Sequence, residues 1–83
     1  VYPLSGELNF KVQKKDGLLE NIAGHFKDAR ETQWIDGLSI YYDTWWANIR
    51  QSNTEPFVRL NVEARTKELL QEKIAELKAL ITT

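Results

Sequence analysis

Cysteine and methionine are absent from this 83-residue chain, and it contains a single histidine. Without cysteine the chain forms no disulfide and offers no thiolate, and one histidine cannot complete a structural zinc site. We therefore predict no metal site in the chain and a cytoplasmic location, with which the lack of cysteine agrees. Because the sequence does not begin with methionine, we expect it to be a piece of a longer polypeptide.

Long apolar runs and an excess of either charge are also missing. No apolar segment approaches the roughly 20 residues that a membrane-spanning helix needs. The formal net charge of -1 at pH 7 gives no general attraction to nucleic acid or to an anionic membrane. An anionic ligand must therefore be bound by a local group of residues. The length and the 42% hydrophobic content indicate one globular domain, residues 1–83, with a modest core.

Two kinds of hydrophobic spacing alternate along the chain. Period-2 alternation indicates strands at residues 7–12, 32–35, 38–42, 45–50 and 57–65. Helical spacing is present in two stripes, which are Leu19, Ile22, Ala23 and Phe26, and Leu70, Ile74, Leu77 and Ile81. Asp16 and Thr66 are the predicted N-caps of these helices. We predict an α+β fold of two layers, an antiparallel four-stranded sheet with two helices packed on one face.

The dipeptide Asp36–Gly37 separates two of the predicted strands. A type I′ turn needs positive φ at both central residues, and Asp-Gly is a preferred pair for it. The sequence therefore predicts a tight hairpin at this point.

The segment from Arg50 to Pro56, Arg-Gln-Ser-Asn-Thr-Glu-Pro, is the part of the chain most suited to binding an anion. Arginine supplies a fork of charge-assisted donors, Ser52 and Thr54 supply hydroxyls, and Asn53 tolerates the positive φ that turns backbone N–H groups toward one point. These groups suit a phosphate. The alternative is an ordinary polar connection between two strands.

The same segment, followed by the strand 58–64, resembles the phosphate-contacting loop and next strand of the α-D-phosphohexomutases. The opening residues 2–10 and the Asp36–Gly37 hairpin resemble the entry and the central hairpin of the C-terminal, fourth domain of these enzymes. The resemblance covers nearly the whole chain. It implies a TATA-binding-protein-like fold and, within the superfamily, it is closest to bacterial phosphomannomutase/phosphoglucomutase.

The resemblance also implies a function. These enzymes interconvert hexose 6-phosphate and hexose 1-phosphate through a bisphosphorylated intermediate, with Mg²⁺ and a phosphoserine held by domains that this chain lacks. The chain alone is expected to be inactive and to hold the phosphate of a mannose or glucose phosphate that is not reacting. Ser5 and Gly6 are expected to form the hinge to the preceding domain.

The strand pattern gives a separate argument about the two arginines near the loop. Ile49 and Val58 are predicted to face the core, so Arg50 and Arg59 lie on the opposite face. Both guanidinium groups are then available to a phosphate. The alternative for Arg59 is an ion pair with Glu63. The expected phosphate contacts are therefore Arg50, Ser52, Asn53, Thr54 and Arg59.

The remaining candidates have simpler explanations. Trp45 and Trp46 must point to opposite faces, one into the core and the other into packing, a sugar or an interdomain contact. His25 is expected at the edge of the core, and Glu55 is expected to shape the loop rather than contact a phosphate. Two other functions fit the residues, a protein-interaction module using the sheet face and a platform for single-stranded nucleic acid. The acidic balance of charge argues against the second.

Overall fold

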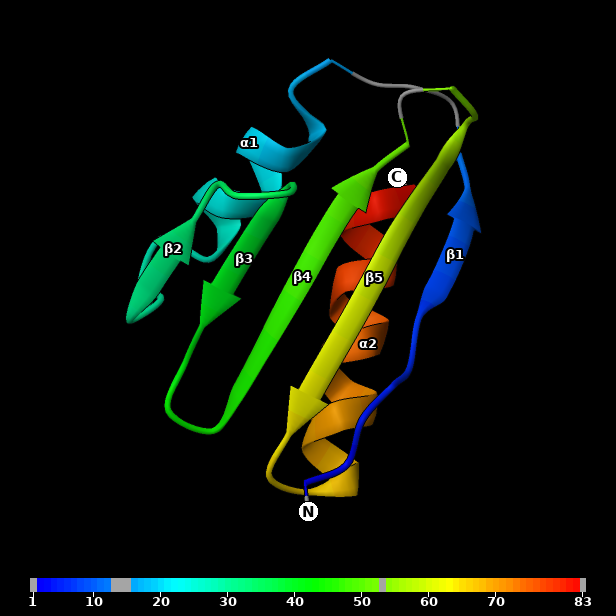
Figure 1. Cartoon of the computed structure of the whole chain (residues 1–83). Helices are drawn as coiled ribbons and strands as arrows, with labels where there is room; N and C mark the ends of the chain where they lie inside the picture. Colours follow the sequence, from blue (N-terminus) through cyan, green and yellow to red (C-terminus); the bar gives the residue numbers. More distant parts are fainter. Residues whose placement is uncertain (1, 13–15, 53, 83) are drawn as a thin grey trace.

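The computed structural model describes residues 2–12, 16–52 and 54–82, which form one antiparallel sheet and two helices (Figure 1). The strands are β1 (Leu8–Lys11), β2 (Glu31–Gln33), β3 (Leu38–Tyr41), β4 (Trp45–Gln51) and β5 (Phe57–Ala64), and the helices are α1 (Leu18–His25) and α2 (Lys67–Thr82). The order across the sheet is β1-β5-β4-β3-β2, and all pairings are antiparallel. The predicted α+β class is confirmed.

The prediction of a four-stranded sheet is wrong by one strand, because all five segments with strand character join the sheet. One of the two edge strands is β2, which has three residues and pairs with β3 from Glu31↔Tyr41 to Gln33↔Ser39. Since β2 ends at Gln33, the connection to β3 is longer than the predicted two-residue turn. Asp36 and Gly37 do have positive φ angles, 51° and 94°, as the turn chemistry requires.

The core lies between one face of the sheet and the two helices. Alternate residues of β4 and β5 are buried, and their neighbours in sequence are exposed or half-buried. The buried side chains of the sheet are Leu38, Ile40, Trp45, Ala47, Ile49, Val58, Leu60, Val62 and Ala64, and those of the helical side are Leu18, Ile22, Phe26, Leu70, Leu77 and Ile81. One face of the sheet therefore forms the core with the two helices, and no helix of the described residues covers the other, outer face.

The two helices begin in different ways. The hydroxyl Oγ1 of Thr66 accepts a hydrogen bond of 3.1 Å from the backbone N–H of Leu69, so the predicted N-cap of α2 is confirmed. The predicted N-cap of α1 is wrong. Gly17, with φ of 78°, occupies that position instead of Asp16, and no side chain caps the first turn. A glycine reaches this left-handed conformation without the steric cost that a residue with a Cβ would meet.

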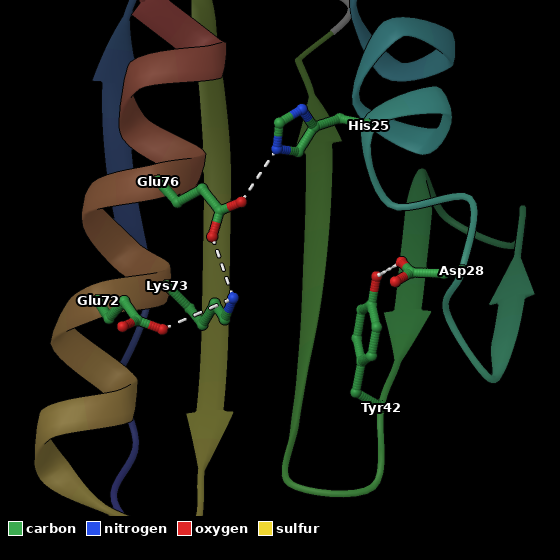
Figure 2. A network of polar contacts seen from close by, with 6 residues as sticks. All are labelled: His25, Asp28, Tyr42, Glu72, Lys73 and Glu76. Atoms are coloured by element: carbon green, nitrogen blue, oxygen red, sulfur yellow. Dashed lines mark hydrogen bonds and ion pairs between the residues drawn. The ribbon is translucent and has the colours of Figure 1, made fainter.

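A polar network joins the helices at the edge of the core (Figure 2). His25 Nε2 at the end of α1 lies 3.0 Å from Glu76 Oε2 on α2, and Lys73 Nζ donates to Glu76 Oε1 at 3.1 Å. Lys73 Nζ also lies 5.0 Å from the ring centroid of the buried Trp45. His25 is thus part of a contact between the helices. Partial burial raises the pKa of the Glu76 carboxyl, but the hydrogen bonds from His25 and Lys73 outweigh it and lower that pKa overall.

Replacing Glu76 by glutamine should remove an acid-sensitive part of the stability. The pKa of Glu76 is lower in the folded chain than in the unfolded chain, so its contribution is present above about pH 4.5 and is lost as the pH falls further. We expect a loss of up to about 1 kcal/mol at pH 7 and a smaller loss at pH 3, measured by urea unfolding. The matched control is Glu72→Gln, since Glu72 is 67% exposed and lies 3.7 Å from Lys73. An equal loss at both pH values for Glu76→Gln would contradict the assignment.

Candidate functional site

The candidate site lies where β4 turns back into β5, at the end of the sheet opposite the N-terminus (Figure 1). Arg50 and Arg59 are direct partners in the β4–β5 register. Both side chains are exposed, while Ile49 and Val58 beside them are buried. The two arginines therefore lie on the outer face, as the strand pattern predicts, with their Cα atoms about 4.5–5.5 Å apart.

Two like charges directly opposite each other are unfavourable in a sheet unless something neutralises them. Among residues 2–12, 16–52 and 54–82, no carboxylate lies within ion-pairing distance of Arg50 or Arg59. The alternative partner of Arg59, Glu63, instead accepts a hydrogen bond of 2.6 Å from Trp46 Nε1. Two exposed arginines are thus direct cross-strand partners, and neither forms an ion pair with a residue in the described part of the chain.

The loop between the two strands folds around Ser52. The N–H of Ser52 donates to the carbonyl of Phe57 at 3.0 Å, which closes the base of the loop. Its hydroxyl Oγ accepts from the backbone N–H groups of Thr54 at 3.4 Å and Glu55 at 3.2 Å. Two backbone donors therefore point toward one oxygen, although that oxygen belongs to Ser52. Asn53, the remaining predicted contact, lies outside the described residues.

Two hollows adjoin these residues. A cavity of about 120 Å³ is lined by Arg50, Gln51, Ser52 and Arg59. A larger one of about 330 Å³ is lined by Asn9, Ser52, Thr54, Glu55, Phe57 and Arg59. Arg59 and Ser52 belong to both, so four of the five predicted phosphate contacts surround neighbouring hollows at one end of the sheet. The polar groups available there are two cations, two hydroxyls and two amides, which suit an anion, together with the carboxylate of Glu55 in the larger hollow.

Comparison with known proteins shows the family of this chain. Residues 7–80 match the family model described as phosphoglucomutase/phosphomannomutase, C-terminal domain. The chain belongs to this family. It is 48% identical over 80 residues to a phosphomannomutase of Methanocaldococcus jannaschii, covering 96% of this chain and 18% of that protein. It is 40% identical over 83 residues to a phosphomannomutase of Vibrio cholerae, covering 98% of this chain and again 18% of that protein.

A solved structure confirms the fold of this phosphohexomutase domain. A phosphoglucomutase/phosphomannomutase family protein from Burkholderia thailandensis superposes on 96% of this chain with a TM-score of 0.70 and 26% sequence identity, and the chain covers 17% of that protein. The domain therefore spans less than a fifth of the relatives it matches, whose remaining parts lie outside this sequence.

One residue at the site, Asn9, was not among the predicted site residues. It is exposed on β1, pairs with Arg59 in the β1–β5 register, and lines the larger cavity. Its place between Leu8 and Phe10, which are half-buried, does indicate the outer face. The sequence gives no local signal for the register of β1 against β5, because β1 ends at Lys11 and β5 begins only at Phe57, about half the chain later.

Ser5, half of the predicted hinge, is held against β5. Its backbone N–H donates to the Val62 carbonyl at 2.8 Å, and its Oγ accepts from the Val62 N–H at 2.8 Å. Gly6 follows with φ of 68° and has no atom near the position of an added Cβ. A hinge at this point would have to break the hydrogen bonds between Ser5 and Val62.

The two adjacent tryptophans point to opposite faces, as predicted. Trp45 is 5% exposed in the core, where its ring stacks on Tyr42 with centroids 4.8 Å apart. Trp46 is half-buried on the outer face and stacks on Tyr41 at 6.0 Å. The outer face therefore carries an aromatic pair as well as the two arginines.

Neither a metal-binding cluster nor a membrane-spanning helix is found among the described residues. In residues 2–12, 16–52 and 54–82, no group of three or more histidine, aspartate or glutamate side chains is placed to hold a metal ion. The Mg²⁺ that the family resemblance implies was expected in domains outside this sequence, so no residue of this chain was assigned to it. No helix in this part of the chain combines the length and apolar character needed to cross a membrane.

Proposed function

We propose that this chain is the phosphate-binding domain of a phosphomannomutase/phosphoglucomutase. The parent enzyme would interconvert hexose 6-phosphate and hexose 1-phosphate through a bisphosphorylated intermediate, and this domain would hold the phosphate that is not reacting. Membership in the C-terminal domain family supports the proposal. The observation that carries it is the pair Arg50 and Arg59, two exposed cations with no ion-pair partner among the described residues, beside a hydroxyl-bearing loop.

The arginines and the loop would bind the phosphate in complementary ways. Each guanidinium can direct two parallel N–H donors at two phosphate oxygens. The hydroxyls of Ser52 and Thr54 would donate further hydrogen bonds to the phosphate. Asn53 is also proposed as a phosphate contact. If the Ser52 side chain rotates, a phosphate oxygen takes its place as the acceptor for the Thr54 and Glu55 N–H groups. The dianion would then relieve the repulsion between Arg50 and Arg59.

The contribution to the reaction is positioning. A site that recognises phosphate rather than sugar serves both orientations of a bisphosphorylated intermediate, because either phosphate can occupy it. Correct placement of the reacting oxygen is worth several kcal/mol of the activation barrier. Mg²⁺ and the phosphoserine would be supplied by the other domains of the parent enzyme. The isolated domain is accordingly proposed to bind a hexose phosphate and to be inactive alone.

Titration of the ¹⁵N-labelled chain followed by NMR tests the proposal. Inorganic phosphate and mannose 1-phosphate should shift the amide signals of Arg50 to Thr54, with dissociation constants of about a millimolar because a single subsite is present. An oligonucleotide is the comparison ligand for the alternative use of the sheet face. Shifts spread over the sheet with the oligonucleotide, and none at the loop with phosphate, would contradict the proposal.

A further inference from the structure

A row of three polar side chains crosses three neighbouring strands at the candidate site. Asn9 of β1 is the direct partner of Arg59 of β5, and Arg59 is the direct partner of Arg50 of β4. Direct cross-strand partners have Cβ atoms about 4.5–5.5 Å apart. Arg59 therefore lies between a second cation on one side and a neutral amide on the other. The neighbour of Arg50 on its far side is Gly37, which has no side chain.

The outward direction of Asn9 is fixed by its strand. Its sequence neighbours Leu8 and Phe10 are half-buried and pack against the core, so the side chain between them faces outward. After β1, the backbone N–H of Val12 donates to the Pro56 carbonyl at 2.9 Å, which ties the end of the strand to the β4–β5 loop. Asn9 thus has a fixed place beside the loop and beside Arg59.

The side-chain amide of Asn9 is available to a neighbour. It lines the cavity of about 330 Å³ together with Ser52 and Arg59. It forms no hydrogen bond with another residue of the ranges 2–12, 16–52 and 54–82. An amide offers a carbonyl oxygen that accepts hydrogen bonds, and a guanidinium group has five N–H donors, more than one phosphate uses. Asn9 Oδ1 can therefore accept from Arg59 while other donors of Arg59 remain for a ligand.

We propose that Asn9 is a positioning residue of the phosphate site and acts through Arg59. In the bound state its Oδ1 accepts a hydrogen bond from Arg59 Nε–H, which leaves the two outer Nη groups to the phosphate. This bond also draws Arg59 away from Arg50, so that a phosphate fits between two cations that repel each other. The inference rests on the proposed phosphate site. It assigns the two arginines different roles, because Arg50 has no such partner in the row.

The variant Asn9→Ala removes the amide at an exposed position, so the chain should fold normally. We expect its affinity for inorganic phosphate, measured by NMR titration at constant ionic strength, to fall about 3- to 10-fold. The control is Asn61→Ala, the same change on the same face of β5 in the next row away from the loop. It should alter the affinity less than about twofold, because it leaves the row of Arg59 intact.

Repeating Asn9→Ala in two arginine variants separates positioning through Arg59 from direct contact with the ligand. The substitution should change the affinity less than about twofold in Arg59→Ala, and it should keep its loss of about 3- to 10-fold in Arg50→Ala. Equal losses in both variants, or no loss in the otherwise unchanged chain, would overturn the positioning role.

The Nε–H signal of Arg59 is a readout that a merely structural role of Asn9 would not move. With saturating inorganic phosphate, hydrogen exchange at this N–H should be slow in the unchanged chain and faster in Asn9→Ala. The same exchange rate in both would overturn the role of Asn9 and leave the phosphate site intact. No shifts at Arg50 to Thr54 with phosphate in the unchanged chain would remove the phosphate site and this inference together.

Discussion

Replacing Arg50 by alanine should weaken the binding of inorganic phosphate and of mannose 1-phosphate roughly 10- to 100-fold. The range corresponds to the loss of one charge-assisted interaction, about 1.5–3 kcal/mol. The fold should be unaffected, because Arg50 is exposed, forms no ion pair with a described residue, and faces another arginine. Isothermal titration calorimetry measures the affinity, and urea unfolding measures the stability.

Two further variants show whether charge or geometry is responsible. Arg50→Lys keeps the charge but loses the planar fork, so it should bind with intermediate affinity. Arg65→Ala removes the same charge at an exposed position after the far end of β5. A loss of affinity in Arg65→Ala as large as in Arg50→Ala would indicate a general effect of net charge and would contradict a local site.

Replacing Gly37 by alanine should destabilise the chain by about 2 kcal/mol or more, which for a domain of this size is a fall in melting temperature of about 8 °C or more. Gly37 has φ of 94°, and an added Cβ would lie 2.5 Å from the Ile49 carbonyl oxygen and 3.1 Å from Arg50 Cα. These contacts are backbone atoms of β4, so side-chain rotation cannot relieve them. Thermal unfolding followed by circular dichroism measures the change.

Gly24→Ala is the matched control for Gly37→Ala. Gly24 lies inside α1, and an added Cβ meets no atom within 4 Å there. Alanine should therefore stabilise the helix by about 1 kcal/mol. The same substitution is thus expected to act in opposite directions at the two positions. A fall in melting temperature of the same size at both would show that the contact of Gly37 with β4 has no special role.

Local sequence patterns predicted much of this fold, and tertiary pairing accounts for the rest. The alternation in β5 places Arg59 on the outer face because one face of that strand is buried. Thr66 was predictable as a cap because the hydrogen bond it accepts is three residues away. By contrast, β2 is an edge strand of three residues that pairs with β3, and its end at Gln33 is set by register rather than by composition.

In the candidate site, too, the residue types could be predicted from the sequence, but part of the geometry could not. Arg50, Ser52 and Thr54 are neighbours in sequence, so their chemistry could be recognised before their geometry. Asn9 joins them only through the pairing of β1 with β5. The bonds from two loop N–H groups to Ser52 Oγ depend on the path of a short loop. These contacts place backbone donors on a side-chain oxygen, an arrangement that residue types alone did not predict.

A crystal structure of the chain grown with mannose 1-phosphate, in large excess over its dissociation constant, tests the central claim most directly. We expect the phosphate between Arg50 and Arg59, within hydrogen-bonding distance of both guanidinium groups and of Ser52. A phosphate bound elsewhere on the chain, with Ser52 Oγ still accepting from Thr54 and Glu55, would contradict the account.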